Sequence, residues 1–102
     1  MSDTPEEIHI MTWQDLTIEV RYKPNYFGEG DDAIAHLDIT CIQPDRHPLP
    51  FSETGYRSHF LRRSWIEGIG GPVDFVMGWL LEASSKRGWQ EMKTKHRQLS
   101  LF

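Results

Sequence analysis

The sequence predicts an α+β domain, in which a small antiparallel sheet of about three strands is followed by a C-terminal helix packed on one face. In residues 16–22 and 35–41 apolar and polar residues alternate, which is the period of half-buried strands. After residue 72 the apolar residues recur at helical spacing instead. Strands that come before helices in this way are typical of the α+β class. At 102 residues the chain has the size of one domain.

Two segments carry the clearest strand pattern, residues 16–22 and residues 35–41. The residues expected to face the core are Leu16, Ile18, Val20, Tyr22, Ala35, Leu37, Ile39 and Cys41. KPNYFGEGDD between them predicts a long hairpin loop, because it is rich in turn residues. The prolines of residues 44–50 predict an extended connection to a third, shorter strand, YRSHFLR. Residues 1–8 are expected to form a loose acidic leader.

A helix is predicted from Pro72 to Arg87, with proline at its first position and Gly88 after its end. Its expected core-facing stripe is Val73, Phe75, Val76, Met77, Trp79, Leu80 and Leu81. A second short helix is expected to end at about Arg97. We therefore predict one α+β domain over residues 1–97 and a separate C-terminal peptide over residues 98–102.

Charge and composition narrow the class of protein. No apolar run is long enough to span a membrane, the acidic N-terminus is unlike a signal peptide, and the single cysteine suits a reducing compartment, so a cytoplasmic location is expected. Residues 1–85 hold 6 Lys/Arg against 14 Asp/Glu, whereas residues 86–102 hold 5 against 1. An acidic body disfavours direct nucleic-acid binding, although the basic end would suit a position near DNA.

The middle of the chain offers a candidate anion-binding site at Arg57, His59 and Arg62. Arginine supplies a bidentate fork for an anion, and histidine a tunable donor. The alternative is a sheet surface whose long side chains pair with nearby carboxylates. No glycine-rich phosphate loop accompanies these residues.

Motifs for metal, cofactor and catalysis are missing from the sequence. His36 and Asp38 lie two residues apart on a predicted strand, but no further ligand has metal-site spacing. Cys41 alternates with core residues and is expected to be an inert buried thiol. We expect no metal and no cofactor, and a non-enzymatic role is favoured over an enzymatic one, which stays open.

The last five residues, QLSLF, carry the strongest functional signal. They resemble the peptide motif by which bacterial proteins bind the sliding clamp of the DNA polymerase, whose favoured form is Q-L-S/D-L-F. The resemblance implies an extended peptide in a hydrophobic pocket of the ring-shaped clamp. Gln98 would make polar contacts, Leu99 would fill a small site, Ser100 would be a spacer, and Leu101 and Phe102 would be the main apolar anchor.

These residues predict a bacterial protein that docks on the clamp as an adaptor or competitor in replication or repair, with DNA as an indirect partner through the clamp. PLPFSETGYRSHF is similar to a stretch of small uncharacterised proteins of proteobacterial chromosomes and mobile elements, which agrees with a bacterial origin. The alternative is a small enzyme or anion- or nucleotide-binding module centred on Arg57, His59 and Arg62. In that case Leu99 and Leu101 would pack into the protein's own core or form a short edge strand.

Overall fold

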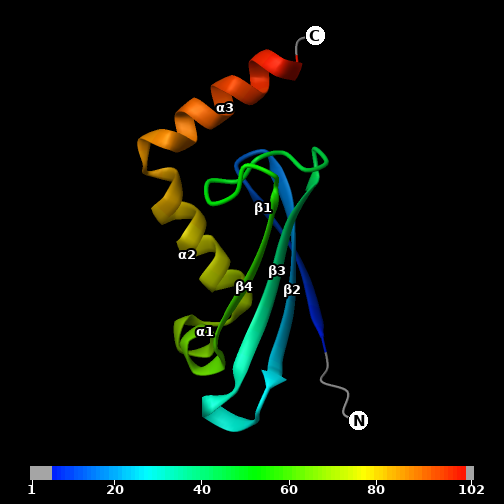
Figure 1. The fold of residues 1–102 in the computed structure, drawn as a ribbon, viewed down its shortest axis with the longest axis vertical. Coiled ribbons are helices and arrows are strands. Elements are labelled where there is room, and N and C mark those ends of the chain that lie inside the picture. Colours follow the sequence, from blue (N-terminus) through cyan, green and yellow to red (C-terminus); the bar gives the residue numbers. More distant parts are fainter. Residues whose placement is uncertain (1–5, 101–102) are drawn as a thin grey trace.

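A four-stranded antiparallel sheet with helices on one face makes up the fold (Figure 1). The computed structural model describes residues 6–100, without the side chains of Asp31, Arg87 and residues 95–100. The strands, in sheet order, are β1 (Glu7–Trp13), β2 (Leu16–Phe27), β3 (Ile34–Gln43) and β4 (Tyr56–Arg62). The helices are α1 (Arg63–Ile69), α2 (Pro72–Ser84) and α3 (Arg87–Ser100), and a short 3-10 turn, η1, spans Gly30–Asp32. The predicted α+β class is therefore confirmed, with one strand more than expected.

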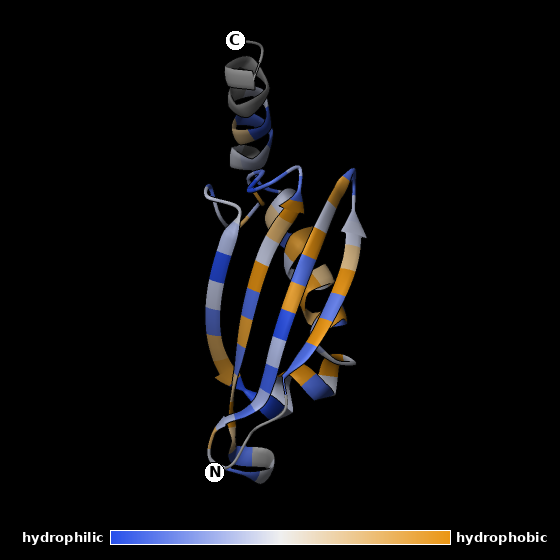
Figure 2. Ribbon diagram, turned by 90° about the vertical axis from the view of Figure 1, so that its right-hand side faces the viewer, coloured by the Kyte–Doolittle hydropathy of each residue, from blue (hydrophilic) through white to orange (hydrophobic). Residues whose placement is uncertain are grey.

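Alternation along the strands builds the core, as the sequence predicts. All eight residues expected to face inward from β2 and β3 are buried. The strands pair antiparallel, with Ile18 opposite Cys41 and Val20 opposite Ile39, so inward residues meet inward residues. Figure 2 shows this alternation of apolar and polar residues on the sheet, with the helices behind it. The other face of the sheet is left open in the described part of the chain.

The strand that sequence analysis missed is β1. It begins at Glu7, so the end of the expected loose leader belongs to the sheet. Met11 and Trp13 are buried on the helix side, whereas Ile8 and Ile10 are exposed on the open side. Because apolar residues lie on both faces, the two-residue period is hidden in the sequence.

The expected long loop after residue 22 is mostly strand. β2 continues to Phe27 through an irregularity in register between Lys23 and Phe27, which accommodates Pro24. At the other end of the sheet, Gly55 is needed for a close approach. Its φ is +76°, and a Cβ there would lie 2.7 Å from the carbonyl oxygen of His47. This lets the connection from β3 to β4 fold against the sheet.

The predicted long helix is α2, whose Val76 and Leu80 are buried in the core. Leu81 is 58% exposed, so its assignment to the core stripe was wrong. The turn formed by residues 70–71 separates α2 from α1, a helix that the sequence analysis did not predict. No helix in the described residues is long and apolar enough to cross a membrane.

Candidate functional site

The predicted anion-site residues are divided between the two faces of β4. Arg57 and His59 pair with Ile39 and Leu37, so they share the face that α2 covers. Arg62 pairs with Ile34 and lies on the opposite face. The alternation of a strand therefore separates Arg62 from the other two, and the sheet does not assemble the three residues into one site.

Arg57 and His59 rest on an aromatic shelf made by Trp79, Phe75 and Phe51. The guanidinium of Arg57 lies 5.4 Å from the centroid of the Trp79 ring, and its Nη1 donates to the Phe51 carbonyl at 3.4 Å. The His59 ring centroid lies 4.8 Å from that of Trp79. Burial, and then the charge of Arg57, lowers the pKa of His59. A histidine held neutral beside one exposed arginine offers little attraction to a phosphate.

A polar cluster lies on the open face of β3 and β4, and sequence analysis did not predict it. His36 Nε2 is 2.7 Å from Ser58 Oγ and 3.6 Å from Asp38 Oδ1. Tyr56 donates its hydroxyl proton to Asp38 Oδ1 at 2.6 Å, which raises the pKa of Tyr56. Finding the cluster requires the register that sets Asp38 opposite Ser58, and no local spacing reveals that register.

This cluster has the residue types of a Ser-His-Asp triad but not its geometry. In a triad the carboxylate holds the imidazole nitrogen that faces away from the serine. Here the same nitrogen, His36 Nε2, faces both Ser58 and Asp38. The hydrogen bonds therefore tie β3 to β4 and do not prepare Ser58 to attack a substrate.

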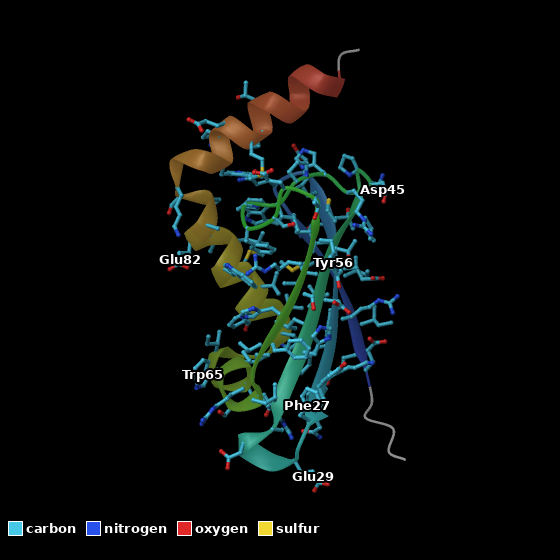
Figure 3. All side chains as sticks on the ribbon, viewed as in Figure 1. Phe27, Glu29, Asp45, Tyr56, Trp65 and Glu82 are labelled. Carbon is cyan, nitrogen blue, oxygen red and sulfur yellow. The ribbon has the colours of Figure 1, made fainter. Side chains whose placement is uncertain are left out.

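Beside the polar cluster, an exposed aromatic patch consists of Tyr26, Phe27 and Phe60. Their exposed fractions are 41%, 61% and 49%. The ring centroid of Tyr26 lies 4.8 Å from Phe27 and 5.2 Å from Phe60. Figure 3 labels Phe27 and Tyr56 on the side of the sheet away from the helices, and Trp65 on the opposite side, at α1.

In the described residues, no three His, Cys, Asp or Glu side chains are grouped so that they could hold a metal ion. His36 and Asp38 are a pair with no third ligand of that kind among the side chains that the structure describes. Cys41 is buried, as predicted, and burial raises the pKa of its thiol. A raised pKa keeps the thiol protonated and unreactive.

The C-terminal motif lies at the far end of α3. The backbone of Gln98, Leu99 and Ser100 forms the last turn of that helix, beyond the boundary predicted at residue 97. Helical geometry at these residues differs from the edge strand considered as an alternative. Leu101 and Phe102 lie outside the described residues, as do the side chains of the three residues before them.

The start of α3 is attached to the sheet through Trp89. This residue is 2% exposed, and its ring centroid lies 5.6 Å from that of Trp13. Met92, one turn later, packs against the same core. Gln90, Glu91 and Thr94 are exposed. Figure 1 shows the later turns of α3 extending past the end of the sheet, toward the C-terminus.

Comparison with known proteins gives a match to one family. The family model described as the KlcB third domain matches residues 6–89. The matched segment begins just before β1 and ends at Trp89, the residue that anchors α3. Among curated proteins and among solved structures, none matches this chain.

Proposed function

This chain belongs to the KlcB third-domain family, and we propose that it docks on the bacterial sliding clamp through the peptide at residues 98–102. The observation that carries the proposal is QLSLF itself, which fits the favoured clamp-binding pattern at every position. The protein acts in the cytoplasm as a non-enzymatic adaptor or competitor in replication or repair. It reaches DNA through the clamp.

The placement of the motif supports this proposal. The family match ends at residue 89, so the motif lies outside the matched domain. A peptide at the end of a helix that extends past the sheet is accessible to a partner.

Binding as an extended peptide requires the last turn of α3 to unwind. The final carbonyl groups of a helix have no partner within it, and terminal turns fray readily. The peptide also loses conformational entropy when it becomes ordered on binding. Two buried apolar anchors of about 1.5–3 kcal/mol each give at most about 6 kcal/mol, whereas a dissociation constant of about 1 μM corresponds to about 8.2 kcal/mol. A micromolar complex therefore also requires the contacts of Gln98 and Leu99 in the pocket.

The test measures binding of the full chain to purified clamp by titration calorimetry. Leu101→Ala/Phe102→Ala should abolish binding and leave the melting temperature almost unchanged, because the anchors contribute to the complex and not to the fold. The control is Arg57→Ala/His59→Ala, which changes two residues of β4 outside the motif, on the face that α2 covers, and should bind as wild type does. A synthetic KTKHRQLSLF peptide should bind with similar affinity.

Two results would contradict the proposal. One is a large drop in melting temperature on truncation after Arg97, which would mean that the tail is part of the core. The other is clamp binding that survives this truncation, which would assign the interaction to the folded body. The anion-binding alternative predicts a third pattern, in which phosphate raises the melting temperature of the wild type but not of Arg57→Ala/His59→Ala.

A further inference from the structure

The sheet has two edges, β1 and β4, and they are not equally protected. At β4 the Tyr56 carbonyl accepts hydrogen bonds from Ser52 Oγ at 2.6 Å and from Thr54 Oγ1 at 3.4 Å, so the connection before the strand covers that end of the edge. β1 has no such cover in the described residues. It contains no proline, lysine or bulge, which are the usual devices that stop an edge strand from pairing.

The direction of the free backbone groups on β1 follows from the register. Cys41 donates its backbone N–H to the Gly55 carbonyl, so the odd-numbered residues of β3 point toward β4. Successive residues of a strand point their N–H and C=O groups to opposite sides. The even-numbered residues of β3 therefore bond to β2, where they meet odd-numbered residues, so the even-numbered residues of β2 bond to β1. On β1 the odd-numbered residues bond to β2, and the backbone groups of Ile8 and Ile10 point away from the sheet.

The side chains of the same two residues are also exposed. Ile8 and Ile10 are 53% and 57% exposed and lie together on the open face. β1 therefore presents free hydrogen-bonding groups and an apolar surface at the same place. An edge with both features is suited to pairing with another strand.

We propose that β1 pairs antiparallel with β1 of a second copy of this chain, joining two sheets into one of eight strands. A two-fold axis through His9 sets Ile8 opposite the partner's Ile10, and the reverse, so that four isoleucines meet on the open face. The same register sets Glu7 opposite the partner's Met11. In this register no carboxylate of one β1 lies directly opposite a carboxylate of the other, so carboxylate repulsion does not oppose pairing with a second copy.

The interface is small. Paired seven-residue strands bury less than the roughly 1,200–2,000 Å² of a standard stable complex. The dimer is therefore expected to form at about 100 μM and to dissociate near about 1 μM. Sedimentation equilibrium across that range measures it. A wild-type chain that stays monomeric up to about 500 μM would overturn the proposal.

A charge placed on the edge should block pairing without disturbing the fold. Ile10→Lys should weaken the dimer at least about tenfold, because it removes an apolar contact and places a lysine, which opposes edge pairing, on each side of the axis. Leu81→Lys is the matched control, since Leu81 is 58% exposed but lies on α2. The control should dimerise as wild type does. Equal dimerisation of wild type and Ile10→Lys would contradict pairing through β1.

A disulfide tests the register itself. His9 and the partner's His9 would form a non-hydrogen-bonded pair, whose Cα atoms lie about 4.5 Å apart, within reach of a disulfide. His9→Cys should therefore give a covalent dimer on mild oxidation. Ile8→Cys should not, because the two introduced cysteines would be offset by two residues, at about 8 Å. Cross-linking of Ile8→Cys and not of His9→Cys would overturn the proposed register.

Discussion

Replacing Trp89 with alanine tests whether one side chain holds α3 to the domain. Trp89 is 2% exposed, and its ring contacts Trp13. Burying about 200 Å² of aromatic surface at about 25 cal/mol per Å² contributes about 5 kcal/mol. The indole Nε1 has no hydrogen-bond partner in the described residues, which costs about 1–3 kcal/mol. The net contribution is therefore about 3 kcal/mol, within the range of about 3–5 kcal/mol for such truncations.

Urea denaturation followed by circular dichroism measures this loss. For a domain of this size, about 3 kcal/mol corresponds to a fall in melting temperature of about 12–24 °C. α3 has 14 residues, and a helix of that length is marginal without packing, so the helical signal of the folded variant should also fall. Trp89→Phe keeps a ring and removes the unpartnered N–H, and its stability should stay within about 1 kcal/mol of wild type. A loss below about 1 kcal/mol for Trp89→Ala would refute the reasoning.

Two further predictions concern the shelf beside β4. Trp79 is half-buried, with its ring 4.3 Å from Phe51, so Trp79→Ala should cost about 1–3 kcal/mol in urea denaturation, less than a core tryptophan would. The pKa of His59 is lower in the folded chain than in the unfolded chain, so the unfolded chain binds more protons as pH falls below about 6.5, and stability should fall with it. His59→Gln should lose less stability than wild type between about pH 7 and about pH 5, and an identical pH profile for both chains would contradict this.

The sequence predicts the centre of the fold better than its margins. β2, β3 and α2 each bury one face, so their period is visible in the chain. β1 has isoleucines on the open face and Met11 and Trp13 on the other, and no period remains. α1 is only 7 residues long and has one buried residue, Ile66, which is too little to give a helical pattern.

The four tryptophans show what composition alone leaves open. Trp13 and Trp89 are buried against each other, Trp79 lies at the margin of the core, and Trp65 is 62% exposed. Trp13 and Trp89 come from the two ends of the described chain, and nothing local indicates that they meet. The cluster of His36, Asp38 and Ser58 is hidden in the sequence for a similar reason, because the register of β3 with β4 brings these residues together. On a strand, odd-numbered and even-numbered residues face opposite sides of the sheet, so the sequence alone could have placed Arg62 on the face opposite Arg57 and His59.

The attachment of α3 at Trp89 also sets a distance. From Trp89 to Ser100 the helix rises about 1.5 Å per residue, so its free end lies about 17 Å from its anchor. A helix keeps that length and direction, which a coil of the same composition would not. The turns of α3 that stay helical therefore set the distance and direction from the sheet at which the following segment begins. Inserting one residue between Trp89 and the tail would turn that direction by about 100°, because a helix has 3.6 residues per turn.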